Sequence, residues 1–308
     1  MSAVAADRKP ASDRKPASDR KPASDRKLTR AVVSSDRRFA AISHALLILW
    51  SVIVIVPMLW VLVSSFKSTG EILSSPFALP DHWRVENYAH AWTDANIGKY
   101  FLNSVIVVVS ALFLVMLLGA MCAYILARFE FPGRRLIYYV MLAGLTFPVF
   151  LAIVPLFFQL QNFGLLNTRP GLILTYVAFA LPFTMFFLYS FFRSLPHDVY
   201  EAALIDGASD WRAFFQVMLP MARPGMAAVA IFNFLGLWNQ FLLPVALNTD
   251  QDKWVLTQGM AAYASSQVYD IDYGALFAAI VVTVVPVLIV YVIFQRRIAG
   301  SVSQGTFR

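Results

Sequence analysis

The sequence predicts an all-α polytopic membrane protein, and three observations lead to that fold class. Hydrophobic residues make up 59% of the 308 positions, charged residues only 14%, and the mean hydropathy is +0.64. A soluble domain carries about 25% charged residues. No long polar block separates the apolar stretches. Six stretches come near or exceed the roughly 20 residues that a spanning helix needs: about 44–65, 100–126, 136–161, 171–192, 224–247 and 274–295.

The first 40 residues differ from the rest of the chain. The hexapeptide Asp-Arg-Lys-Pro-Ala-Ser begins at Asp7, Asp13 and Asp19. With few apolar side chains to bury, residues 1–40 are expected to form a disordered tail. A basic segment touching anionic lipid is the alternative. The following apolar stretch is too long for a signal-peptide core, so we interpret it as the first, uncleaved span.

Lysine and arginine counts predict the orientation. The N-terminal tail, the 127–135 loop, the 193–223 loop and the C-terminal tail hold 20 of the 25 basic residues, and the opposite loops hold five. By the positive-inside rule, both termini and the 193–223 loop lie in the cytoplasm. Residues 41–300 then form the membrane domain, and residues 301–308 form a cytoplasmic tail.

The predicted spans contain prolines and neutral polar residues but no Asp, Glu, Lys or Arg in their cores. Prolines kink helices, which suits a bundle that must open on alternate sides, and ordinary packing irregularity is the alternative. The missing charges argue against proton or sodium coupling. Asn233, Gly236 and Gln240 share one helix face. The candidate pathway residues for a neutral polyhydroxylated ligand are Asn233, Asn239, Gln240 and Tyr176. Helix–helix hydrogen bonding explains the amides equally well.

The segment 194–223 interrupts the apolar chain with charged residues and predicts a helical hairpin. Ser194 can cap a first helix, Gly207 fits the left-handed position that ends it, and Ser209 can cap a second. Four apolar residues of the second helix follow an amphipathic spacing and are expected to pack on the bundle: Trp211, Phe214, Phe215 and Met218. The first helix is then left exposed for a partner, although a hairpin without a partner fits the pattern too.

One motif in this hairpin is specific in its spacing. Glu201-Ala202-Ala203, three residues, Gly207, nine residues and then Val217-Met218-Leu219-Pro220 resembles the EAA signature of ABC importer permeases. The departure is Val217, where that signature has isoleucine. Further stretches resemble permeases of the carbohydrate-uptake, maltose-permease-like type, and together they cover about residues 45–300: Ala127–Phe129, Phe131–Arg134, Gly164–Thr168, Phe191–Pro196 and Trp238–Leu242.

The resemblance implies a type I importer permease fold with six transmembrane helices and a cytoplasmic coupling helix. The implied partners are a second permease subunit in a heterodimer, two ATPase subunits and an extracytoplasmic sugar-binding protein facing loops 66–98 and 248–273. ATP and magnesium would be bound by the ATPase. The implied coupling residues are Glu201, Ala202, Ala203, Asp206 and Gly207.

The sequence therefore predicts a membrane translocation subunit, not an enzyme, of an ATP-driven sugar importer in the bacterial inner membrane. The sequence lacks the phosphate-binding loop Gly-x-x-x-x-Gly-Lys-[Ser/Thr]. It also lacks a His/Cys metal motif, and no feature favours nucleic acid over lipid as a partner. An importer for another solute and a non-transporting membrane scaffold are the alternatives.

Overall fold

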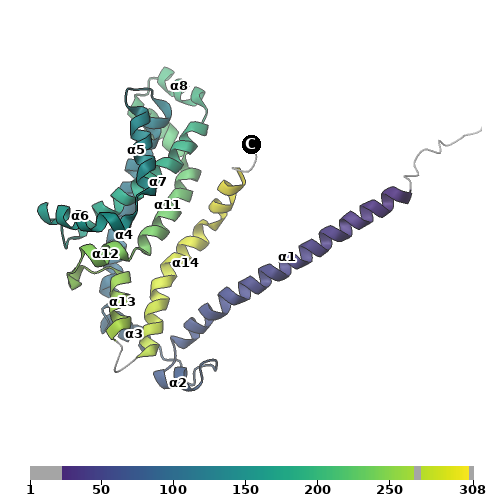
Figure 1. Cartoon of the computed structure of the whole chain (residues 1–308), viewed down its shortest axis with the longest axis vertical. Helices are drawn as coiled ribbons and strands as arrows, with labels where there is room; N and C mark the ends of the chain where they lie inside the picture. The colour runs from purple at the N-terminus through teal and green to yellow at the C-terminus, as the bar shows by residue number, and fades with distance from the viewer. Residues whose placement is uncertain (1–22, 267–271, 305–308) are drawn as a thin grey trace, which may run out of the picture. The chain divides into compact units, whose positions relative to one another are not determined.

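The computed structural model describes residues 23–266 and 272–304, with side chains over 40–266 and 272–295. All regular elements in these residues are helices (Figure 1). They divide into two compact units, residues 1–59 and 60–308. The helices are α1 (Ala23–Ser64), α2 (Thr69–Ser74), α3 (Glu86–Thr93), α4 (Ile97–Arg128), α5 (Arg134–Thr146), α6 (Val149–Asn162), α7 (Arg169–Ser194), α8 (His197–Ile205), α9 (Asp210–Arg212), η1 (Ala213–Met218), α10 (Leu219–Met221), α11 (Arg223–Trp238), α12 (Leu242–Leu247), η2 (Gln251–Lys253), α13 (Leu256–Ser266) and α14 (Tyr273–Gln304).

The first unit consists, in its described part, of residues 23–59 of helix α1. Its described residues begin at Ala23 and are helical from there on. Residues 23–40 are thus helical, where the sequence predicted disorder. The prediction for residues 1–22 lies outside the described residues.

The core of the second unit is the packing of α4 along α7. Small residues of α4 allow the close approach, as is common between membrane helices: a Cβ on Gly119 would lie 2.5 Å from the Thr184 side chain. Val107 and Val115 of α4 and Leu188 of α7 are fully buried and belong to the hydrophobic core. This pair forms the frame on which the other helices of the unit pack.

The third predicted span is broken in the structure. Helix α5 ends at Thr146 and α6 begins at Val149, with their axes bent by 106°. Pro148 stands at the break and Phe147 is extended there, because a residue before proline avoids the helical region. Pro155, Pro182 and Pro286 instead lie inside α6, α7 and α14.

The fifth predicted span ends as a helix at Trp238, and the separate helix α12 follows. The segment Asp210–Met221 is bent by 76° from α11. In the described residues, four helices are long and apolar enough to cross a membrane, or six if each bent pair counts as one span. The number of spans therefore stays a prediction.

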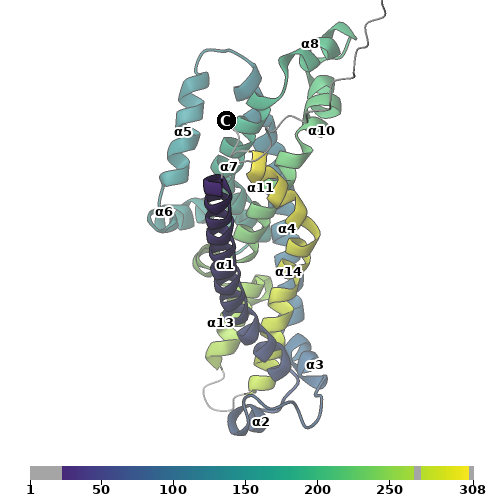
Figure 2. The ribbon, with the colours of Figure 1, turned by 90° about the vertical axis from the view of Figure 1, so that its right-hand side faces the viewer.

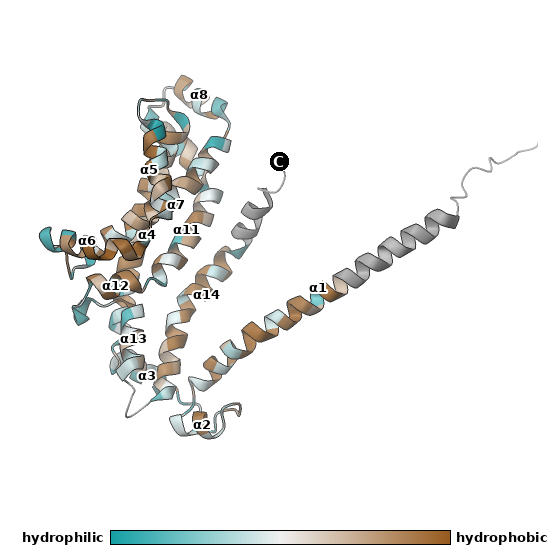
Figure 3. Ribbon diagram, viewed as in Figure 1, coloured by the Kyte–Doolittle hydropathy of each residue, from teal (hydrophilic) through white to brown (hydrophobic). Residues whose placement is uncertain are grey.

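The second unit has two polar ends. Helix α8 lies at one end, whereas α2, α3 and α13 lie at the other (Figures 1 and 2). Hydrophobic residues predominate along the long helices between them (Figure 3). The loops predicted to face opposite sides of the membrane thus occupy opposite ends. We call the end that holds α2, α3 and α13 the distal end.

A buried lysine organises part of the distal end. Lys67 is fully buried, and its Nζ donates to the carbonyl oxygens of Ser75, at 3.0 Å, and Pro76, at 3.2 Å. The Asn87 amide donates to the carbonyls of Ser65 and Lys67, at 2.9 Å each. Helix α3 is thereby tied to the chain that leaves α1.

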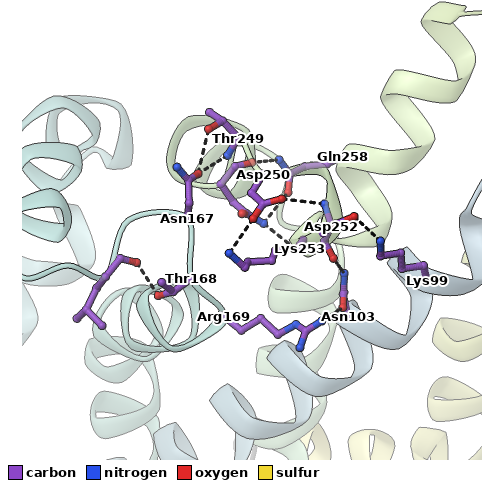
Figure 4. Close-up of polar contacts among 12 residues, drawn as sticks. Lys99, Asn103, Asn167, Thr168, Arg169, Thr249, Asp250, Asp252, Lys253 and Gln258 are labelled. Atoms are coloured by element: carbon purple, nitrogen blue, oxygen red, sulfur yellow. Dashed lines mark hydrogen bonds and ion pairs between the residues drawn. The ribbon is translucent and has the colours of Figure 1, made fainter.

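A second polar network joins the start of α4, the start of α7 and the 248–254 loop (Figure 4). The Asn103 amide donates to the carbonyls of Asp252, at 3.0 Å, and Trp254, at 2.9 Å. Its Oδ1 accepts a 2.7 Å bond from Arg169. On the other side of the loop, Asn167 Oδ1 accepts from the Thr249 amide and hydroxyl. The loop is held from both α4 and α7.

Glu71 gives the distal end a predictable acid response. Its carboxylate accepts from the Ser68 and Asp81 amides and the Ser68 hydroxyl, and these bonds lower its pKa from 4.5 to about 2. A lowered pKa stabilises the fold fully above pH 4.5, and this contribution falls as the pH drops towards 2. We expect hydrogen exchange of α2, corrected for its intrinsic pH dependence, to accelerate in that window. In Glu71→Gln this acid-dependent step should be missing, and an identical step in the variant would contradict the assignment.

Candidate functional site: coupling hairpin and membrane cavity

The first helix of the hairpin that holds the EAA residues begins two residues later than predicted. Helix α8 starts at His197 after extended Leu195 and Pro196. Ser194 is the last residue of α7, and its hydroxyl donates to the Phe191 carbonyl at 2.7 Å. The predicted Ser194 cap is therefore wrong, because this hydroxyl is used within α7 and the extended residues before His197 separate the two helices.

Gly207 ends α8 in the predicted left-handed conformation, with φ +82°. Its amide donates to the Leu204 carbonyl at 3.0 Å, and the Ala208 amide donates to the Ala203 carbonyl at 2.9 Å. This pair of bonds is a Schellman motif, which satisfies the last carbonyls of a helix. The predicted cap of the second helix is confirmed, since Ser209 Oγ accepts from the Arg212 amide.

Tyr200 holds α8 onto the bundle. The side chain is buried, its hydroxyl donates to Asp210 Oδ1 at 2.7 Å, and burial together with Asp210 raises its pKa. Its ring lies 6.1 Å from that of Phe129 and 6.5 Å from that of Tyr124, centroid to centroid. Tyr124 in turn contacts Phe214 of η1 at 4.9 Å. Aromatic contacts thus connect α8 to the end of α4 and to η1.

Most of the predicted coupling residues are presented to the outside. Glu201, Ala202, Asp206 and Gly207 are exposed, and Ala203 is half-buried. Glu201 also pairs with His197 at 3.0 Å. Ile205 was not singled out from the sequence, yet its side chain is 85% exposed.

The predicted aromatic stripe of the second helix only partly packs on the bundle. Phe214 and Met218 are buried, whereas Trp211 is 63% exposed and stacks on exposed Phe215. The chain forms a π-helix over Ala213–Met218, a wider turn that changes which residues share a face. The expectation for Trp211 and Phe215 was wrong because it assumed α-helical spacing throughout.

The hydrogen bond from Tyr200 to Asp210 can be tested without disturbing the aromatic packing. Tyr200→Phe removes only the hydroxyl, so we expect the hairpin to lose about 1 kcal/mol. Hydrogen exchange in α8 should quicken severalfold while exchange in α7 stays unchanged. Tyr189→Phe, on the neighbouring helix α7, is the matched control. Equal protection of α8 in the wild type and in Tyr200→Phe would show that the bond contributes nothing.

A cavity of about 340 Å³ lies where α5 breaks from α6, between α7 and α11. It brings together three of the four predicted pathway residues, Tyr176, Asn233 and Gln240, and also Gly236 of the shared face. Phe179, Phe183 and Phe232 line it as well, while none of its lining residues is Asp, Glu, Lys, Arg or His. The cavity is thus neutral, with amides and aromatic rings side by side.

The individual pathway candidates differ in their exposure and in the hydrogen bonds of their side chains. Asn233 is 5% exposed, and its amide donates to Thr184 Oγ1 at 2.7 Å, so it does bridge two helices. Tyr176 is buried. Asn239 is exposed and donates to the Leu235 carbonyl; the structure does not bring it into this cavity. Two amide candidates line the cavity, Asn233 and half-buried Gln240. Among the described residues, only Asn233 uses its side chain to bridge to a neighbouring helix.

These features, a helical bundle around a neutral cavity with a capped hairpin at one end, define a membrane transport subunit. The chain belongs to the family of binding-protein-dependent transport system inner membrane components, whose model matches residues 115–304. It is therefore an inner-membrane translocation component of an ABC importer rather than an enzyme, and it acts with a substrate-binding protein. The predicted fold class and family resemblance are confirmed.

Among its relatives, the chain is 95% identical over the full length of both chains to the diacetylchitobiose uptake system permease protein NgcG of Streptomyces coelicolor. It is 33% identical to the trehalose transport system permease protein SugB of Mycobacterium tuberculosis, over 82% of this chain and 92% of the relative.

The fold also matches a solved structure. A bacterial ABC transporter involved in the import of the acidic polysaccharide alginate superposes with a TM-score of 0.73 and 22% identity. The match covers 85% of this chain and 97% of the other. At this TM-score the two chains share the fold.

Proposed function

We propose that this chain is the permease subunit of an ATP-driven importer for diacetylchitobiose. The observation that carries the proposal is the 95% identity to NgcG along the whole chain. At 95% identity, few of the residues around the cavity can differ between this chain and NgcG. The cavity chemistry agrees, since a neutral disaccharide of N-acetylglucosamine offers hydroxyl and acetamido groups to amides and its ring faces to aromatic side chains.

The proposal includes a topology and a set of partners. Both termini and α8 lie in the cytoplasm. Two ATPase subunits bind the coupling helices of the two permease subunits there, and one of them holds α8 of this chain through its exposed face. ATP and magnesium belong to those subunits. A second permease subunit, different from this one, completes the pathway around the cavity. An extracytoplasmic sugar-binding protein docks on the distal end.

In this mechanism ATP-driven closure of the ATPase pair moves α8, and the aromatic contacts of Tyr200 carry the movement into α4. Helix α7 packs along α4, and α7 and α11 both line the cavity. Residues on both sides of the break at Pro148 line the cavity, so one of its walls lies at a joint between two helices. A shift of α4 and α7 therefore changes the walls of the cavity itself.

Uptake in whole cells tests the substrate. We expect deletion of this chain to abolish accumulation of labelled diacetylchitobiose at low micromolar concentration, and a plasmid copy to restore it. Excess unlabelled diacetylchitobiose should suppress the restored uptake, whereas excess trehalose should not. Undiminished uptake in the deletion strain would contradict the function, and suppression by trehalose alone would contradict the sugar.

A further inference from the structure

A second, polar cavity of about 610 Å³ opens beside the hairpin end of the bundle. It lies between the end of α4, the start of α5 and the end of α7. Its lining residues are basic and aromatic: Arg134, Arg135 and Arg193 with Tyr138, Tyr139 and Tyr189. Neither the EAA motif nor the membrane cavity uses these side chains.

The cavity carries excess positive charge. Its single acidic lining residue is Glu130, which reaches Arg134 at 3.6 Å while remaining almost fully exposed. Arg135 and Arg193 have no carboxylate partner among the described residues. The guanidinium of Arg193 instead lies over the Tyr189 ring at 5.8 Å. Three arginines facing one carboxylate favour an anionic ligand.

The surroundings indicate where that anion comes from. The three tyrosines are packed on one another, with Tyr138 and Tyr189 ring centroids 4.8 Å apart. Tyrosine gathers at the boundary between hydrocarbon and headgroups, and α5 and α7 continue from here into apolar sequence. Basic pockets between helices on the cytoplasmic side of a membrane, where the proposed topology puts this cavity, bind anionic lipid headgroups.

We propose that this cavity binds the phosphodiester headgroup of an anionic phospholipid. Arg135 and Arg193 contact the phosphate oxygens, and the tyrosine rings lie along the glycerol region. The ligand would link the first turn of α5 to the last turn of α7, close to where α8 begins. The site is independent of the sugar that the importer carries.

Lipid retention tests the proposal. The protein is purified with its co-purifying subunits from nanodiscs that contain phosphatidylglycerol and phosphatidylcholine. It is then washed in mild detergent, and native mass spectrometry identifies the lipids that stay bound. We expect preferential retention of phosphatidylglycerol. The double variant R135Q/R193Q should retain it on the order of 10-fold less, whereas R135K/R193K should keep most of it. Arg84→Gln, an exposed arginine of the distal end, serves as control and should behave as wild type.

Three outcomes would overturn the proposal. One is equal retention of the two lipids by the wild type, and another is undiminished retention by a folded R135Q/R193Q variant. The third is displacement of the lipid by millimolar inorganic phosphate, which would make this a small-anion site. Melting curves show whether R135Q/R193Q folds, and if it does not, the single variant Arg135→Gln, at an exposed position, takes its place.

Discussion

Replacing Gly207 with valine is expected to reduce sugar uptake at least about tenfold while leaving the amount of protein in the membrane unchanged. No atom lies within 4 Å of a Cβ built at this position, so the effect comes from the backbone alone. A left-handed conformation costs a side-chain-bearing residue roughly 1–2 kcal/mol, and a β-branched one more. Relief of that strain requires the Schellman turn to open, which misplaces the exposed face of α8.

Gly70→Val is the matched control for this prediction. Gly70 also has open space around its Cβ but lies in α2 with an ordinary backbone conformation. The same substitution there should leave uptake within about twofold of the wild type, because helix propensity differs little between the two residues. The readout is the rate of labelled-sugar uptake per copy of membrane-inserted protein. Equal uptake by both variants would show that the turn geometry is irrelevant to transport.

Replacing Asn103 with leucine is expected to destabilise the distal end by about 2–4 kcal/mol, since its three hydrogen-bond partners are left unpaired in a closed environment. Asn103 is 2% exposed, so water cannot replace the lost amide. Two of those partners are backbone carbonyls of the 248–254 loop and the third is the Arg169 guanidinium. The loss of stability should therefore affect both the 248–254 loop and the start of α7.

Thermal unfolding in detergent measures this effect, and hydrogen exchange locates it. We expect a clear fall in melting temperature and faster exchange in residues 248–258, while exchange in α8 at the opposite end is unchanged. Asn162→Leu, at an exposed position near the end of α6, should alter neither quantity. An unchanged melting temperature for Asn103→Leu would mean that the network does not hold the loop.

Helix content, the turn at Gly207 and the cap at Ser209 could be predicted from the sequence because each depends on local chemistry. Long apolar stretches must form helices in a bilayer, since every backbone group needs a partner. Gly207 suits the left-handed turn at the end of a helix because glycine has no Cβ that would clash there. These features are confirmed by the structure.

The misses concern features that the apolar pattern alone does not distinguish. The length of the apolar stretch 136–161 predicts one spanning helix and does not show that the chain bends by 106° at Pro148. The stripe from Trp211 to Met218 presupposes α-helical spacing, and the π-helix that replaces it has no local signal that we can identify. Sequence spacing could place Asn233 and Gln240 on one face, but only the fold shows that Tyr176 joins them and Asn239 does not.

Site-specific cross-linking decides whether an ATPase subunit holds the exposed face of α8. The single cysteine, Cys122, is first replaced by serine, and a cysteine is then introduced by Ala202→Cys or, at the distal end, by Ser74→Cys. In membranes from cells that produce the whole transport system, we expect position 202 to cross-link to an ATPase subunit, with a yield that changes when ATP is added, and position 74 to give no such cross-link. A cross-link to the ATPase from position 74, or none from position 202, would contradict this expectation.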